Sequence, residues 1–301
     1  MRTPIFPDFR EIAIEDSDEI EEHLASTQPE TSEMTFASLF IWQREFRTEW
    51  SMYDRWLLFM ERREGGSRYF LPPAGESVQP EVVIELLAWL RDVTGDARPA
   101  IERADCRLAA LMKESFDIEP MPEHFDYVYR RQALAELTGR QFDAKRNQIN
   151  RLHAKSGFRC EELRTEHIPD CFRVLEEWLA WRRSRHDTDI AADGPATHEA
   201  LKYLGRLPLK GEVIVVGNRV EAFSLNERLN RDTQVVQLEK ATPRFGGIFA
   251  MIANQTAKRC ADEIKWINRG QDLGIAGLRK AKRSFCPNHL IEKYRIRPAR
   301  R

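Results

Sequence analysis

The sequence is poor in cysteine and has no long apolar run. Its five cysteines are odd in number and form no CxxC pair: Cys106, Cys160, Cys171, Cys260 and Cys286. This argues against a disulfide framework or a zinc site and indicates a reducing compartment. No apolar run approaches the roughly 18–20 residues that a membrane-spanning helix needs. The acidic N-terminus, MRTPIFPDFREIAIEDSDEIEE, lacks the apolar core of a signal peptide. We therefore expect a cytoplasmic protein without an integral membrane segment.

Histidine is also scarce, with seven residues in 301. Two of them are candidates for a metal-binding or base role: His186, in RHDTD, and His289, near the C-terminus. Neither has partners at metal-ligand spacing, so we expect surface or capping roles and no metal. No Ser-His-Asp constellation can be located either.

Charge is unevenly distributed along the chain. Residues 1–130 hold 27 acidic and 14 basic residues, a net charge of −13, whereas residues 131–301 hold 21 and 33, a net charge of +12. The basic half favours a phosphate-bearing partner such as a nucleotide, RNA or anionic lipid. The alternative is that the two halves attract and neutralise each other.

Hydrophobic periodicity predicts the same order of elements twice. In the C-terminal half this order is helix, helix, three antiparallel strands, glycine loop, helix, strand, helix and strand. The three strands are GEVIVVG, RVEAFSLNERL and TQVVQLEKAT, and NHLIEKYRI is the expected last strand. The N-terminal half shows a weaker version. It includes the amphipathic helix EVVIELLAWLRDV, with its apolar face formed by Val82, Val83, Leu86, Leu87 and Leu90. We expect an α/β (α+β) protein with mixed, mostly antiparallel sheets flanked by helices.

Four stretches carry a family resemblance: MTFASLFIWQREFRTEW (34–50), LTGRQFDAKRNQINRL (137–152), 220–241 and INRGQDLGIAGLRKAKRSFCP (267–287). With the element order, they resemble the GCN5-related N-acyltransferase (GNAT) fold in its FemABX-type tandem form. More specifically, they resemble a bacterial family related to the C-terminal domain of phosphatidylglycerol lysyltransferases. The resemblance implies two GNAT-like domains, an acidic one at 1–135 and a basic one at 136–301 that carries the active cleft.

The glycine loop PRFGG partly fits the pyrophosphate-binding pattern of this fold, Q/R-x-x-G-x-G/A. Arg244, Gly246 and Gly247 stand in it, and Arg244 and Gly247 fit the spacing. The free N–H groups of a helix N-terminus can hold an anion. Phe249 stands where a small residue belongs, which disfavours coenzyme A. The alternative is an ordinary glycine turn before a helix.

The polar helix AKRNQINRLHAK lies at the expected junction of the two halves. Lys145, Arg146, Asn147 and Asn150 could hold a phosphate, carbonyl or amide group. Ligand sites favour such junctions. The alternative is a solvated helix between the repeats.

Three further residues are candidates for acid, base or anion-binding roles. Glu239 could remove a proton from an attacking amine, and Lys240 could bind phosphate or carboxylate. As strand neighbours they point to opposite faces, so only one of them faces a given cleft. Tyr294 could act as a general acid, as a Tyr does in some acyltransferases. The alternatives are surface charges for the first two and a core position for Tyr294.

The stretch INRGQDLGIAGLRKAK, 267–282, combines a strand end, two glycines and a basic helix. We expect Asp272 to cap that helix and a buried stripe of Ile275, Leu278, Ala281 and Phe285. We interpret Asn268, Arg269 and Gln271 as substrate contacts at the strand end, and we count Asp272 with them as a candidate substrate- or phosphate-binding residue.

These features favour a transferase that moves an acyl or aminoacyl group to an amine or hydroxyl of a small molecule or peptide. The donor would be aminoacyl-tRNA or acyl-coenzyme A, and no other cofactor is indicated. Two alternatives remain open. One is a non-enzymatic protein that binds tRNA or another anion, and the other is a coenzyme A-dependent N-acetyltransferase of a small amine.

Overall fold

A computed structural model describes residues 2–299 except 64, 76–77 and 186–191, with the backbone alone at 155 and 156. The chain forms two compact units. The first comprises residues 1–126 and 291–301, and the second comprises residues 127–290. Within the described residues, no helix combines the length and apolarity needed to cross a bilayer.

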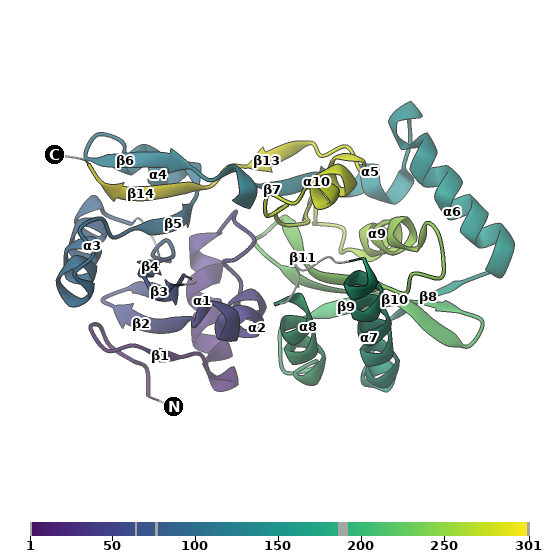
Figure 1. The fold of residues 1–301 in the computed structure, drawn as a ribbon, viewed down its shortest axis with the longest axis horizontal. Coiled ribbons are helices and arrows are strands. Elements are labelled where there is room, and N and C mark those ends of the chain that lie inside the picture. The colour runs from purple at the N-terminus through teal and green to yellow at the C-terminus, as the bar shows by residue number, and fades with distance from the viewer. Residues whose placement is uncertain (1, 64, 76–77, 186–191, 300–301) are drawn as a thin grey trace. The chain divides into compact units, whose positions relative to one another are not determined.

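The first unit is built on one seven-stranded sheet with the strand order β1-β2-β3-β4-β5-β14-β6 (Figure 1). Its pairs are antiparallel except β4–β5, which is parallel. The elements are β1 (Arg10–Glu11), a 3-10 turn (Ile14–Asp16), α1 (Ser17–Thr27), α2 (Phe36–Phe46), β2 (Glu49–Tyr53), β3 (Trp56–Arg62), β4 (Arg68–Phe70), α3 (Pro80–Thr94), β5 (Ile101–Ala104), α4 (Cys106–Met112), β6 (Phe116–Pro120), a 3-10 turn (Pro122–His124) and β14 (Tyr294–Pro298).

Helix α3 shows how the first unit gains its core. Pro80 occupies the first helical turn, where its missing N–H costs nothing, and Gly95 ends the helix in the left-handed conformation. The predicted apolar face of α3 is buried and packs in one cluster with residues such as Leu58 of β3 and Ile296 of β14. The amphipathic pattern therefore correctly predicted which face of this helix turns inward.

The second unit contains another seven-stranded sheet, with the order β13-β7-β12-β11-β10-β9-β8. All its described pairings are antiparallel except β11–β12. The elements are β7 (Asp126–Arg130), α5 (Arg131–Glu136), a 3-10 turn (Arg140–Phe142), α6 (Asp143–Ser156), β8 (Arg159–Glu162), a 3-10 turn (Thr165–His167), α7 (Ile168–Ser184), α8 (Asp193–Lys202), β9 (Lys210–Val216), β10 (Arg219–Arg228), β11 (Thr233–Ala241), α9 (Ile248–Arg259), β12 (Trp266–Asn268), α10 (Ala276–Arg283) and β13 (His289–Ile291).

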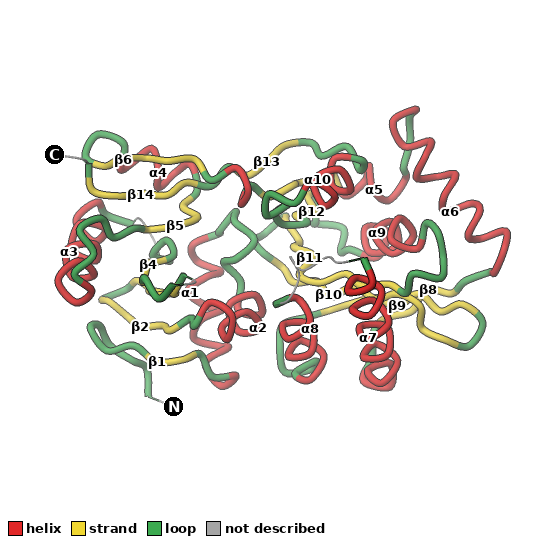
Figure 2. Tube along the Cα trace, in the orientation of Figure 1, coloured by secondary structure: helices red, strands yellow, loops and turns green. Residues whose placement is uncertain are grey.

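Helices cover both faces of the second sheet. Ala222 of β10 packs with Met251 of α9, on one face. Lys240, on the other face of β11, lies 4.6 Å from the Trp178 ring of α7. Figure 2 shows α7 and α8 on one side of β9–β11 and α9 on the opposite side. A residue of β11 therefore faces either α7 and α8 or the side of α9.

The C-terminal stretch NHLIEKYRI forms two strands in two sheets, so the prediction of a single last strand is wrong. β13 pairs with β7 in the second sheet, and β14 inserts between β5 and β6 in the first. Lys293 lies between them and is fully buried. Its ammonium donates to both oxygens of Glu33 and to Asp126 Oδ1, at 2.7 Å each. These ion pairs anchor the returning chain in the first unit.

Candidate active site

The second sheet opens between β11 and β12. These parallel strands pair only from Thr233–Trp266 to Val235–Asn268. Beyond this point β11 continues to Ala241, whereas the chain after β12 turns away at Gly270, where φ is 64°. We call this opening the β11–β12 fork. In α/β sheets, ligands bind beyond the carboxyl ends of strands where neighbouring connections diverge.

A β-bulge in β11 lies just beyond the last β11–β12 pair. Leu225 pairs with Leu238 and Asn226 with Val236, so Gln237 is the extra residue of β11. The bulge changes which face the following side chains reach. Glu239 then lies opposite Ser224, on the face of α9, and Lys240 lies on the face of α7. The predicted opposite orientation of these two neighbours is confirmed.

Arg269 and Glu239 join the two arms of the fork. Arg269 Nη2 donates to both carboxylate oxygens of Glu239, at 2.9 Å each. The side chains are only 13% and 10% exposed. The guanidinium carbon also lies 4.5 Å from the centre of the Phe285 ring. The guanidinium is thus fixed by an acid and an aromatic ring.

Lys145 of α6 adds a second cation to this cluster. Its Nζ lies 3.9 Å from the centre of the Phe285 ring, a geometry in which the negative ring face attracts the ammonium. Burial lowers the pKa of Lys145, and the charge of Arg269 lowers this pKa further. No carboxylate of the described residues forms an ion pair with its nitrogen. The Phe285 ring therefore has two cations beside it, and Glu239 pairs with one of them, Arg269.

Tyr129, Phe285 and Cys286 complete the surroundings, and the sequence did not identify them as site residues. Tyr129 and Phe285 meet edge to face, with ring centres 6.5 Å apart. The Tyr129 hydroxyl donates to Lys282 O at 2.8 Å, and burial raises the pKa of this hydroxyl. Cys286 is exposed and follows Phe285. The sequence predicted Phe285 only as a member of a buried stripe with Ile275, Leu278 and Ala281. Of these four residues, only Phe285 is buried.

Asn268 and Asp272 stabilise the turn after β12. Asn268 is fully buried, and its Oδ1 accepts the Gly270 N–H at 2.8 Å. Asp272 accepts hydrogen bonds from Tyr127 Oη, Arg279 Nε and Gly274 N, at 2.7, 2.7 and 2.9 Å. Burial opposes its ionisation, but these hydrogen bonds outweigh burial and lower its pKa to about 2.

The expected helix-capping role of Asp272 is wrong. Helix α10 begins at Ala276, and the residue at its N-cap, Ile275, offers no side-chain acceptor. Asp272 instead fixes the loop before the helix. Gln271, between Gly270 and Asp272, is half-buried in this loop.

The remaining candidates on α6 are exposed or already engaged by other residues. Arg146 donates to Gly139 O at 2.9 Å, to Leu137 O and to the carboxylate of Asp143. Asn147 and Asn150 are exposed. The structure therefore brings only Lys145 of this group to Arg269 and Glu239.

Lys240 and Arg244 lie against the opposite helical layer. Lys240 Nζ contacts both carboxylate oxygens of Asp193, at 2.9 and 3.0 Å. Arg244 donates to Glu177 Oε1 at 2.7 Å, and its second nitrogen lies 3.6 Å from Glu221. These cations are neutralised by acids of α7, α8 and β10 rather than gathered at the fork.

The glycine loop is closely covered by α6. Gly247 has φ of 93°, and a Cβ there would lie 2.8 Å from the Gln148 carbonyl oxygen. A Cβ added at Gly246 would instead meet no neighbouring atom within 4 Å. Because a carbonyl oxygen repels phosphate oxygens, its approach to Gly247 disfavours a pyrophosphate at this turn.

Tyr294 belongs to the first unit. It lies on β14 opposite Ala104 and Pro120. Its hydroxyl donates to Glu292, and this hydrogen bond raises the pKa of Tyr294 to about 12. Of the two histidines, His289 is exposed and its Nδ1 lies 3.1 Å from Asn288 Oδ1, whereas His186 lies outside the described residues.

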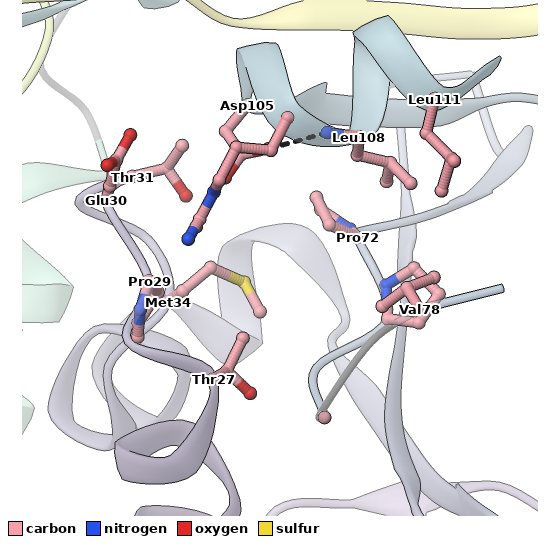
Figure 3. A pocket seen from close by; sticks show the side chains of 13 residues that line it. Thr27, Pro29, Glu30, Thr31, Met34, Pro72, Val78, Asp105, Leu108 and Leu111 are labelled. Carbon is pink, nitrogen blue, oxygen red and sulfur yellow. Dashed lines mark hydrogen bonds and ion pairs between the residues drawn. The ribbon is translucent and has the colours of Figure 1, made fainter.

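The first unit also contains a cavity of about 250 Å³ (Figure 3). Asp105 caps α4 at this cavity by accepting the Leu108 N–H at 3.0 Å, and it pairs with Arg107 at 2.6 Å. The walls are mainly apolar, and none of the predicted site residues takes part. The lining consists of Thr27, Pro29, Glu30, Thr31, Met34, Pro72, Pro73, Gly75, Val78, Asp105, Arg107, Leu108 and Leu111.

Two mostly antiparallel sheets, each flanked by helices in the predicted order, define a tandem GNAT-type acyltransferase fold. The expectation of this fold is confirmed. The family described as the C-terminal region of phosphatidylglycerol lysyltransferase matches residues 24–297, and the chain belongs to this family. No curated protein sequence matches the chain.

Three solved structures illustrate the similarity. A conserved protein of unknown function from Bacteroides thetaiotaomicron is 27% identical, with a TM-score of 0.88 over 97% of this chain and 99% of that one. L-PGS from Bacillus licheniformis is 15% identical, with a TM-score of 0.66 over 100% and 95% of the two chains. FemX is 10% identical, with a TM-score of 0.60 over 96% of each chain. At such low identity the last two show the fold alone.

Proposed function

We propose that the protein transfers an acyl or aminoacyl group to an amine or hydroxyl acceptor, and that the β11–β12 fork is the reaction centre. The observation that carries this proposal is the Arg269 guanidinium, held between Glu239 and Phe285 at the opening of the sheet. Family membership supports the reaction class. The family takes its description from phosphatidylglycerol lysyltransferase, so lipid hydroxyls are acceptors to test.

The chemistry of acyl transfer suits this cluster. As the acceptor attacks the donor's ester carbonyl, negative charge develops on the carbonyl oxygen. Arg269 would stabilise this charge, and fixed donors of this kind contribute more in a water-poor site than in solvent. Glu239 would hold Arg269 in place. The acceptor would attack directly in a ternary complex, so much of the acceleration would come from positioning.

We propose aminoacyl-tRNA as the donor in preference to acyl-coenzyme A. Three features of the glycine loop disfavour a coenzyme A pyrophosphate: the Gln148 carbonyl at Gly247, the ion pairs of Arg244, and Phe249 on the first turn of α9. The net charge of +12 over residues 131–301 favours a large polyanion.

The test combines binding and turnover. Thermal unfolding would be followed with acetyl-coenzyme A, coenzyme A and bulk aminoacylated tRNA at two salt concentrations, because a ligand of the native state raises the unfolding temperature. Transfer would then be assayed with phosphatidylglycerol micelles, glycerol and small amines. A salt-sensitive shift with charged tRNA and a transferred aminoacyl group support the proposal.

Other outcomes separate the alternatives. A shift with acetyl-coenzyme A and acetylation of an amine would replace the proposal with coenzyme A-dependent chemistry. Salt-sensitive tRNA binding without turnover on any of these acceptors would indicate a binding protein that keeps the fold without the reaction.

A further inference from the structure

Lys145 occupies an unusual setting for a lysine. Its ammonium lies over an aromatic ring, 3.9 Å from the ring centre, and the side chain is half-buried. The same ring faces Arg269, whose guanidinium carbon is 4.5 Å from the ring centre. Two cations therefore share one aromatic partner. The ring attracts the ammonium, but partial burial and the nearby Arg269 charge outweigh this attraction and disfavour the charged form of Lys145. An arginine does not lose its proton, so Lys145 is the group of this pair that can become neutral.

The other charged groups around Lys145 do not compensate for Arg269. On α6 itself, Arg146 and Asp143 pair with each other. The carboxylate of Glu239 is occupied by Arg269 through both of its oxygens. The titratable and charged groups that face Lys145 from the neighbouring elements are Arg269 after β12, Glu239 of β11 and Cys286 after α10.

We propose that Lys145 is the group that accepts the proton from the attacking nucleophile. This proposal rests on the proposed function and assigns a step within it. Glu239 is the other candidate base at the fork, but both of its oxygens already accept hydrogen bonds from Arg269. Lys145 has a lone pair to offer when unprotonated, and it has no acid partner among the described residues that would hold it as an ammonium.

The step balances as follows. The acceptor's oxygen or nitrogen forms a bond to the donor's ester carbon while its proton moves to the neutral Nζ of Lys145. The ester C–O bond of the donor then breaks, and the electron pair leaves with the donor oxygen. That oxygen takes the proton from the Lys145 ammonium, which regenerates the neutral amine.

The first test measures the titration of Lys145 without any substrate. Lysines would be reductively methylated with ¹³C-formaldehyde, and the NMR shifts of the methyl groups would be recorded as a function of pH. The signal that is lost in Lys145→Arg identifies Lys145. We expect Lys145 to lose its proton at lower pH than Lys258, an exposed lysine of α9. Arg269→Gln should move the Lys145 transition to higher pH. The proposal would be overturned if Lys145 lost its proton at the same pH as the exposed lysines and if Arg269→Gln left that pH unchanged.

The second test measures transfer from bulk aminoacylated tRNA to phosphatidylglycerol, whose hydroxyl does not itself titrate in the assay range. Lys145→Arg keeps a positive charge but supplies no base. We expect kcat of this variant to fall about 10²–10⁴-fold, which is the usual contribution of general base catalysis. Its kcat should also no longer rise with pH as the wild-type kcat does. Lys145→Ala should recover part of its rate when methylamine is added. Lys258→Arg is the matched control and should retain the wild-type rate.

The outcomes distinguish the two proposals. If wild-type protein transfers and Lys145→Arg keeps both its rate and its pH profile, Lys145 only binds an anion and the base assignment fails alone. If the wild-type protein transfers to none of the acceptors, the proposed function fails and the base assignment falls with it.

Discussion

Arg269 reaches across the β11–β12 fork and donates to both carboxylate oxygens of Glu239, at 2.9 Å each. The pair links two parallel strands beyond the point where their backbone pairing ends at Val235 and Asn268. The ion pair therefore takes over from the backbone hydrogen bonds in fixing the width of the opening. Its contribution can be measured both as stability and as catalysis.

The stability effect of this pair should be strongly non-additive. Arg269→Met leaves a carboxylate that is only 10% exposed without its cation, which should lower the free energy of unfolding by about 3 kcal/mol. Glu239→Gln should cost less, and the double variant should cost less than the sum of the two. Urea unfolding of all four proteins gives the coupling energy. Strict additivity would mean that the two side chains do not interact in solution.

The two glycines of the PRFGG loop should respond differently to alanine. Gly247 has φ of 93°, and its new Cβ would meet the Gln148 carbonyl at 2.8 Å. Gly247→Ala should therefore lower the unfolding free energy by about 1–3 kcal/mol. Gly246→Ala adds a methyl group into open space and should change it by less than about 0.5 kcal/mol. Equal effects of the two changes in thermal unfolding would contradict the close approach of α6.

Lys293 should be among the most sensitive charged positions of the chain. Its ammonium is fully buried between Glu33 and Asp126, so Lys293→Met takes the 2.7 Å ion-pair partner away from two buried carboxylates. A loss of about 3–5 kcal/mol is expected. The exposed Lys113 provides the control, because Lys113→Met should be nearly neutral. A Lys293→Met protein as stable as this control would rule out the buried ion pairs.

Asp272 should contribute to acid sensitivity. Its pKa is lowered to about 2 in the folded protein, from 3.8, so its contribution to stability is full above pH 4 and is lost as pH falls toward 2. Arg279, a main partner, is 40% exposed, which limits the contribution to roughly 1–2 kcal/mol. Asp272→Asn should be less stable than wild type at pH 7, and the difference should shrink at pH 2–3. Urea titrations at these pH values check the trend, and a difference independent of pH would refute it.

The sequence predicted the elements and the orientation of neighbouring side chains well. The apolar period of α3 depends on local spacing, and so does the alternation of side-chain direction along a strand such as β11. The opposite faces of Glu239 and Lys240 follow from the same alternation. These predictions needed no knowledge of which element lies beside which.

The partners of the charged residues could not be predicted in the same way. Arg244 fits a phosphate-binding pattern, but Glu177 of α7 occupies its guanidinium. Lys145 meets Phe285 only because α6 and the chain after α10 converge on the fork, 140 residues apart in sequence. The split of NHLIEKYRI between two sheets depends on the buried ion pairs of Lys293. Such contacts are tertiary, and no local period encodes them.

The most direct test of the fork as the reaction centre is the initial rate of aminoacyl transfer by Arg269→Met. The assay would use bulk aminoacylated tRNA and phosphatidylglycerol, at a temperature where circular dichroism shows the variant folded. We expect a drop of about 10²–10³-fold in kcat, as for the loss of one oxyanion donor, with tRNA binding little changed. A folded Arg269→Met protein that transfers at the wild-type rate would contradict the assignment of the active site.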